Sequence, residues 1–166
     1  MPEKSERHDA SPILVPVDFS IHSLAALQWA AETARCFDAP LVVLHVVHDP
    51  GAAPGYYSQG GQDLRPLEEE AREMLDSFVD KARESYPDVD QIERLERRLV
   101  VGLPANRILE VAEKVGARLI VMGSQGRTGL DHLLIGSKAE RVVRLSPIPV
   151  TIVKAAPTVR TKGQTP

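Results

Sequence analysis

The chain has 166 residues, of which 43% are hydrophobic and 26% charged, and its formal net charge is −3 at pH 7. This length suits one domain, and charges of both signs are interspersed, which leaves no basic field for nucleic acid. No apolar run approaches the roughly 20 residues that span a bilayer, and the N-terminus is too polar for a signal peptide. A cytoplasmic protein without nucleic-acid or membrane partners is expected.

Cys36 is the only cysteine, so the sequence excludes an intrachain disulfide and a zinc site built on several thiols. Its small or apolar neighbours, Ala34, Phe37 and Ala39, predict that it packs as a small hydrophobic residue.

The chain begins with a polar arm over residues 1–10, which is expected to be flexible, and a domain is expected over residues 11–155. Residues 13–17 form an apolar run that predicts a strand, and Ser20 and Ser23 behind it are candidate helix caps. Apolar residues at helical spacing extend this helix to Phe37, and the pattern stops at residues 38–40.

The middle of the chain starts with LVVLHVV at residues 41–47, a continuous apolar run that predicts a buried strand. Residues 48–63 are rich in glycine and proline and predict a long loop. An amphipathic helix is predicted over residues 67–82, with its many charges forming a solvated face. Residues 95–101 predict a third strand that ends at Gly102.

The last third continues the alternation of strands and helices. Pro104 suits the first turn of a helix that ends at Gly116. A strand over residues 118–122, a glycine-spaced segment, a helix through Val142 and Val143, and a strand over residues 148–153 follow. The tail, residues 156–166, is expected to be disordered.

The predicted order alternates five strands with four helices, and the apolar strands are typical of a parallel sheet covered on both faces. We therefore expect a single doubly wound, five-stranded, Rossmann-like α/β domain. Such sheets bind ligands at the carboxyl ends of their strands, at the point where the strand order reverses. Asp18, Gly102 and Gly123 each follow directly after a predicted strand, at this edge.

The segment GSQGRTGLDHLLIGSKAE, residues 123–140, carries the strongest chemical signal. Gly123 and Gly126 allow main-chain N–H groups to approach a ribose or phosphate. Gly136 and Ser137 open a helix, whose unpaired amides favour an anion, and Lys138 adds positive charge. The segment matches neither the Walker loop nor the G-x-G-x-x-G fingerprint.

Each of these residues also has a structural interpretation. Ser137-Lys138-Ala139-Glu140 fits the S-x-x-E capping box, in which Ser137 would only hold the helix start. Asp18 is a favoured residue for a helix cap or a turn, and Val46 would be apolar in any buried strand. Arg127 suits a solvated loop as well as a phosphate clamp.

Three histidines lie near the predicted site, namely His45, His48 and His132. They show neither the i, i+4 spacing nor the carboxylate partner of a metal site. We interpret them as structural or surface residues and expect no protein-held metal centre.

The glycine segment has the form G-x2-G-x9-G-S/T, which resembles the nucleotide-binding signature of the universal stress protein family. Other stretches resemble successive parts of the same family domain: ILVPVDFS, LVVLHVV, VVGLPANRILEVA and AERVVRLSPIPVTIVK. The resemblance implies an adenine nucleotide alpha hydrolase-like fold. Because the glycines are kept, it places the chain in the ATP-binding branch of the family.

The resemblance implies a role for ten residues in binding ATP. They are Pro16, Val17 and Asp18 at the end of the first strand, Val46 in the second, Met122 at the end of the fourth, and Gly123, Gly126, Gly136, Ser137 and Lys138 in the glycine segment. The family often has an apolar residue where this chain has Lys138. The implied ligand is ATP, with Mg²⁺ or Mn²⁺ as a companion ion and ADP or AMP as alternatives.

The implied function is a nucleotide-dependent sensor or regulator in the stress response, with a regulatory protein partner. A homodimer is expected through the apolar last strand, residues 148–153, which would lie at a sheet edge. The alternatives are a slow ATPase or phosphotransferase that uses Ser124 or Ser137 as acceptor, and an interaction module without nucleotide. A two-component receiver would need an Asp after the third strand, where this chain has Val101 and Gly102.

Overall fold

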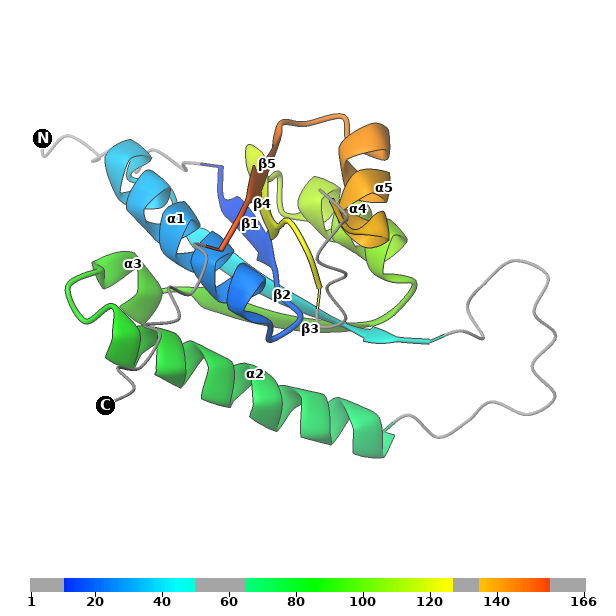
Figure 1. The fold of residues 1–166 in the computed structure, drawn as a ribbon, viewed down its shortest axis with the longest axis horizontal. Helices are drawn as coiled ribbons and strands as arrows, with labels where there is room; N and C mark the ends of the chain where they lie inside the picture. Colours follow the sequence, from blue (N-terminus) through cyan, green and yellow to red (C-terminus); the bar gives the residue numbers. More distant parts are fainter. Residues whose placement is uncertain (1–10, 50–64, 127–134, 156–166) are drawn as a thin grey trace, which may run out of the picture.

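A parallel five-stranded sheet with the order β3-β2-β1-β4-β5 forms the centre of the molecule (Figure 1). The structure, a computed structural model, describes residues 11–49, 65–126 and 135–155. Outside this part lie the predicted arm, the predicted tail, residues 50–64, which include most of the predicted long loop, and residues 127–134. The strands are β1 (Ile13–Pro16), β2 (Leu41–His48), β3 (Glu96–Gly102), β4 (Leu119–Gly123) and β5 (Val150–Val153). The predicted fold class is confirmed.

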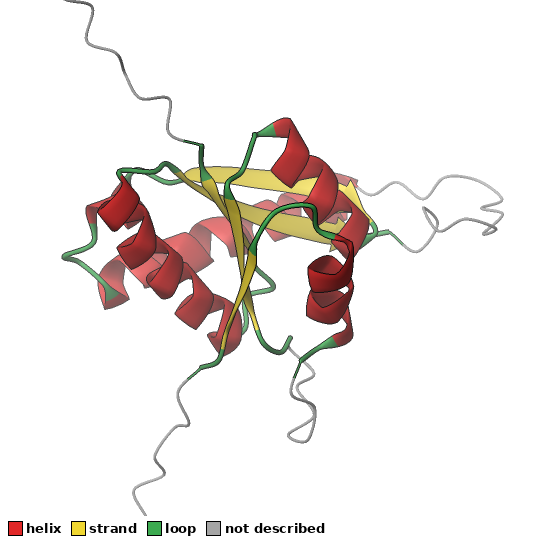
Figure 2. Cartoon of the chain, turned by 90° about the horizontal axis from the view of Figure 1, so that it is seen from above, coloured by secondary structure: helices red, strands yellow, loops and turns green. Residues whose placement is uncertain are grey.

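Helices cover both faces of the sheet (Figure 2). One face packs against α1 (Ile21–Phe37), α2 (Arg65–Ser85) and α3 (Asp90–Glu93), and the other against α4 (Pro104–Lys114) and α5 (Ser137–Leu145). The short helix α3 was not expected, because four residues are too few to show a helical period. It contributes Ile92, which is fully buried, to the core on its face.

The strand sequences read as continuous apolar runs because their successive side chains enter two different cores. Val15 and Val43 pack on the side of α1 and α2, whereas Leu14 and Leu44 pack on the side of α4. Successive side chains of a strand point to opposite faces, so a strand covered on both faces needs apolar residues at every position. This explains the patterns of β1, β2 and β4.

The two edge strands are less buried than the sequence analysis expected. Glu96 and Arg97 at the start of β3 are exposed, and all four residues of β5 are only partly buried. An edge strand has a neighbour on one side only, so part of its surface remains open. In β3 this edge also carries an ion pair of Arg97 with Asp76 of α2, at 2.9 Å.

The last strand starts later than predicted, at Val150 instead of residue 148. The Ser146 hydroxyl donates to the Ile148 carbonyl at 2.7 Å and accepts the Ile148 N–H at 3.2 Å. This local turn takes up the polar groups of Ile148, and the flanking Pro147 and Pro149 have no N–H to offer a ladder. Residues 146–149 therefore form the connection from α5 instead of a strand.

The first helix begins as predicted, with Ser20 as its N-cap accepting the Ser23 N–H at 3.2 Å. The prediction for its last turn was wrong, because Cys36 is exposed. Two residues along a helix turn the side chain by about 200°, so Cys36 lies opposite the buried Ala34. Phe37 is also 54% exposed, with the Arg118 guanidinium 4.8 Å from its ring centroid.

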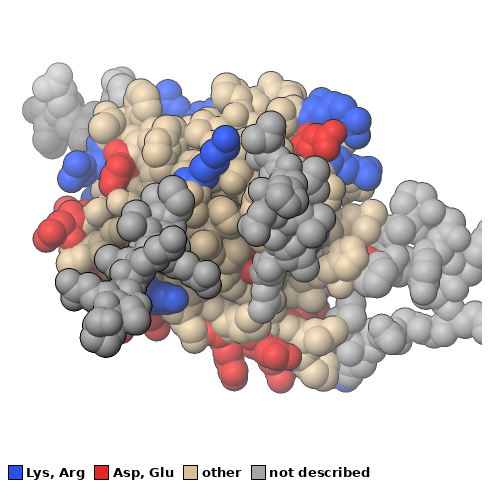
Figure 3. All heavy atoms as spheres, in the orientation of Figure 1, with Lys and Arg blue, Asp and Glu red and all other residues tan. Residues whose placement is uncertain are grey.

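The outer face of α2 is strongly charged, as the sequence predicted. Figure 3 shows acidic side chains along the edge of the molecule where α2 runs in Figure 1. The exposed acidic residues of this helix are Glu69, Glu70, Glu73, Asp76, Asp80 and Glu84, Glu68 is half-buried, and all seven stand on a scaffold of buried apolar residues. Among the described helices, none is both long and apolar enough to cross a membrane.

Candidate functional site

The candidate site lies at the carboxyl ends of β1 and β4, where the strand order reverses. From β1 the sheet continues to β2 and β3 on one side and to β4 and β5 on the other. Pro16, the last residue of β1, is buried and pairs with Leu44. The next residue, Val17, is also buried, and its N–H donates to the Leu44 carbonyl at 2.8 Å. This bond aligns the segment that leads to Asp18 with β2.

Asp18 and Gly126 meet across this switch point. Asp18 Oδ1 accepts the Ser20 N–H at 3.1 Å, so Asp18 brackets a turn, while the cap of α1 is Ser20. The other carboxylate oxygen, Oδ2, faces Gly126, where an added Cβ would lie only 2.9 Å away. Fold topology thus brings together two residues that the sequence analysis selected from distant segments.

Gly123 has a packing reason to be glycine. It is the last residue of β4, one position later than predicted, and a Cβ there would lie 2.7 Å from the carbonyl carbon of His22 in α1. Met122 before it is buried and pairs with Ile152 of β5. These two residues therefore join α1 and β5 to the end of β4, next to the turn that carries Gly126.

The start of α5 is held against the turn after β4. The Gly136 N–H donates to the Ser124 carbonyl at 2.8 Å, and the Ser124 N–H donates to the Val153 carbonyl at 2.8 Å. A Cβ at Gly136 would be in ordinary contact with the backbone of Ser124, Gln125 and Gly126, at 3.6 to 3.9 Å. Gly126 and Gly136 are thus neighbours, and Ser124 is 3% exposed beneath them.

The N-terminus of α5 contradicts the capping-box interpretation of Ser137. The N-cap is Gly136, with extended backbone angles (φ −69°, ψ 150°), and Ser137 is the first residue of the helix. Within the described residues no side chain caps this helix, and the first helical bond runs from the Glu140 N–H to the Gly136 carbonyl at 2.9 Å. The N–H groups that precede Glu140 in the first turn of α5 have no acceptor inside the helix. This helix start therefore suits the binding of an anion.

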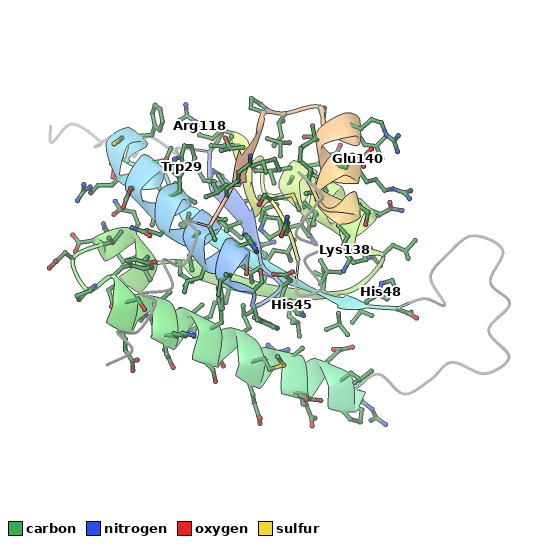
Figure 4. The ribbon with its side chains drawn as sticks, viewed as in Figure 1. Trp29, His45, His48, Arg118, Lys138 and Glu140 are labelled. Carbon is green, nitrogen blue, oxygen red and sulfur yellow. The ribbon has the colours of Figure 1, made fainter. Side chains whose placement is uncertain are left out.

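The side chains of Ser137 and Lys138 are both exposed at this helix start. Figure 4 shows Lys138 on the side of the molecule where His45 and His48 mark the carboxyl half of β2. Val46 lies between these histidines, is partly buried and pairs with Val100 of β3. Val46 therefore lies on β2, the direct neighbour of β1, on the side of the site opposite the glycine turn.

The sequence analysis missed a contact directly behind Asp18. Phe19 has a left-handed backbone (φ 67°), and its ring stacks on that of His45, with centroids 4.2 Å apart and an interplanar angle of 27°. His45 also bonds through Nδ1 to the Val17 carbonyl at 2.8 Å. The only sequence signal for this contact was a histidine within an apolar strand. The interpretation of His45 as a structural residue is confirmed.

The other histidines add no metal centre to the described site. His48 is exposed at the end of β2, as expected for a surface residue. His132 lies outside the described residues, as do Arg127 and Gly129. Within residues 11–49, 65–126 and 135–155, no group of three or more His, Cys, Asp or Glu side chains is arranged to hold a metal ion.

An open depression of about 490 Å³ lies beside the site, between Phe19 and α2. Its wall includes Met74 and Phe78 and the charged groups of Glu70, Glu73 and Lys81. None of the ten residues selected from the sequence lines it. It is therefore separate from the candidate nucleotide site.

Known proteins resemble this chain over most of its length. Residues 10–154 match the model of the universal stress protein family. A universal stress protein of Methanocaldococcus jannaschii is 41% identical over 144 residues, which cover 86% of this chain and 81% of that protein.

Solved structures of universal stress proteins also resemble this chain. A UspA of Lactobacillus plantarum has 26% identity and a TM-score of 0.66, with 87% of this chain and 98% of that chain covered. A universal stress protein of Archaeoglobus fulgidus, solved in complex with dAMP, has 26% identity and a TM-score of 0.58, with 88% and 99% covered. The chain described here belongs to the universal stress protein family.

Proposed function

We propose that this chain binds ATP at the switch point between β1 and β4, with ADP or AMP as alternative ligands, and acts as a nucleotide-dependent regulator of a cytoplasmic stress response. The observation that carries the proposal is the convergence of Asp18, Gly126 and Gly136 at one sheet edge. Family membership and the dAMP complex of the Archaeoglobus fulgidus relative support an adenine nucleotide as the ligand.

The nucleoside half of the ligand would lie over β1 and β2. Asp18 supplies a carboxylate that can accept hydrogen bonds from ribose or base, next to a glycine backbone that leaves room for them. On the β2 side, Val46 offers main-chain groups to the adenine. Pro16, Val17 and Met122 form the buried support for these contacts.

The phosphates would lie at the start of α5. The first turn of this helix offers unpaired N–H groups and the positive end of the helix dipole. Gly136 leaves space at this point, and the exposed Ser137 and Lys138 add a hydroxyl and a positive charge. A companion Mg²⁺ or Mn²⁺ ion would be held by the phosphate oxygens and by water, which are the oxygen donors that Mg²⁺ prefers.

The proposal includes two kinds of protein contact. The apolar edge strand β5 would pair with its twin in a homodimer, and a regulatory protein would read the nucleotide state. Turnover of ATP is a second candidate function, because Ser137 is exposed at the proposed phosphate site. Ser124 is a poor phosphoryl acceptor by comparison, since it is 3% exposed.

The decisive experiment is to purify the chain under native conditions, identify any retained nucleotide by mass spectrometry, and titrate the emptied protein with ATP, ADP and AMP by calorimetry. Asp18→Asn should weaken ATP binding by roughly tenfold or more, the size expected when a charged hydrogen-bond partner is lost. Asp38→Asn is the matched control, because Asp38 ends α1 at the other edge of the sheet and Asn tolerates its left-handed backbone.

The outcomes separate the candidate functions. A retained nucleotide and a loss of affinity in Asp18→Asn alone support the proposed site. Labelled ATP that is converted to free phosphate or to phosphoprotein supports the enzyme. An empty protein that ignores all three nucleotides overturns the nucleotide proposal and favours an interaction module.

A further inference from the structure

One side chain holds the residues on both sides of Asp18. His45 Nδ1 lies 2.8 Å from the carbonyl oxygen of Val17. A carbonyl can only accept, so Nδ1 carries the proton and donates. The imidazole ring of the same His45 stacks on Phe19, with 4.2 Å between the ring centroids. Asp18 is therefore flanked in the chain by two residues that His45 contacts.

The backbone at Phe19 needs such support. Its φ of 67° is left-handed, a conformation that is strained for a bulky residue and persists only where the surroundings enforce it. The Phe19 ring lies against His45 on β2 and against Phe78 on α2, where the centroid distance is 5.7 Å. Packing from two elements thus offsets the strain and fixes the direction in which the chain leaves Asp18.

We propose that His45 is a positioning residue for the nucleotide site, which sets the orientation of the Asp18 carboxylate without touching the ligand. The inference rests on the proposed function for its effect on binding. With Val17 and Phe19 held, the turn places Asp18 Oδ1 on the Ser20 N–H at 3.1 Å and directs Oδ2 toward Gly126. A carboxylate ordered before the ligand arrives spares the ligand the cost of ordering it.

Two substitutions separate the hydrogen bond from the stacking. His45→Phe keeps a ring against Phe19 but has no donor for the Val17 carbonyl. His45→Asn keeps an N–H donor near the position of Nδ1 but has no ring. His48→Phe is the matched control, because the same change is made three residues later in β2 at an exposed position.

The primary readout is hydrogen exchange of the Ser20 amide in the nucleotide-free protein, because this amide donates to Asp18 Oδ1. We expect protection of Ser20 to fall in His45→Phe relative to the amide of Leu27, which is buried in the middle of α1. General destabilisation would lower both. ATP affinity should fall by roughly fivefold to tenfold, the size of one lost hydrogen bond, and His45→Asn should recover part of both effects.

The proposal is overturned if His45→Phe matches His48→Phe in Ser20 protection and in affinity, or if His45→Asn recovers neither quantity. If the unaltered protein does not bind ATP while Ser20 protection still falls in His45→Phe, the positioning role stands and the nucleotide proposal fails. Should His45→Phe not fold, Phe19→Gly replaces it, since glycine adopts a positive φ without strain. Unchanged Ser20 protection in that variant would also overturn the proposal.

Discussion

The carboxylate of Asp18 faces the backbone of Gly126 so closely that a Cβ at position 126 would lie 2.9 Å from Asp18 Oδ2. The two residues come from the turns after β1 and β4, which are neighbours in the sheet. Gly126 therefore leaves the space that this orientation of the carboxylate needs.

Gly126→Ala should weaken ATP binding by roughly tenfold, because the added methyl group displaces a charged hydrogen-bonding group. Calorimetric titration measures the change. In an Asp18→Ala background the same substitution should have little further effect, since the displaced group is already gone. Fully additive losses in the double variant would show that the two residues act independently.

Gly123→Ala should act on stability instead. Its methyl group would lie 2.7 Å from the His22 carbonyl carbon, and backbone in a packed helix cannot move as a flexible side chain does. Overpacking of this kind costs about 1–3 kcal/mol of unfolding free energy. Urea unfolding should show this loss for Gly123→Ala and a smaller one for Gly126→Ala, where the residue is exposed. Equal losses would refute the packing explanation.

Gly136→Val should abolish ATP binding and leave a folded domain. Among the described residues other than its chain neighbours, the nearest atom to a Cβ at Gly136 is 3.6 Å away. This packing accepts the side chain, but its branches would occupy the space that the phosphates need at the helix start. Calorimetry with thermal melts run alongside measures both quantities. An unchanged affinity would mean that Gly126 and Gly136 serve the loop only and Gly123 only the packing against α1, and the nucleotide proposal would fall with them.

Ser137→Ala should now affect binding and hardly affect stability, because the N-cap of α5 is Gly136. Affinity for ATP should fall by about 1.5–3 kcal/mol if the hydroxyl donates to a phosphate, and the unfolding free energy should change by less than about 0.5 kcal/mol. The opposite result, a loss of about 0.5–2 kcal/mol in stability with unchanged affinity, would restore the role of Ser137 as a cap.

The edge strand β5 predicts a homodimer. It is apolar, it pairs with β4 on one side, and its residues are partly buried in the single chain. Unpaired backbone groups along such an edge favour pairing with a second copy. Light scattering at micromolar concentration should return twice the mass of one chain. A single-chain mass that persists after ATP is added would contradict the prediction.

The sequence by itself determined the fold class and most of the elements. Continuous apolar runs such as residues 41–47 predict strands buried on both faces, and helical spacing between them predicts the covering helices, because each pattern follows from local backbone geometry. The glycine spacing at residues 123, 126 and 136 also identified one side of the candidate site. The sequence did not predict the four-residue α3, because so short a helix shows no period. It also did not predict the exposure of Cys36, which depends on which side of α1 meets the sheet.

Only the tertiary structure decided how the candidate site is assembled. Three contacts depend on strand order and on the register between strands. Asp18 faces Gly126, Gly136 bonds to Ser124, and His45 supports the turn behind β1. The structure also gave Gly123 a packing role and made Gly136, not Ser137, the cap of α5. Contacts between residues far apart in the chain leave no periodic signal, because periodicity records only which face of an element is covered.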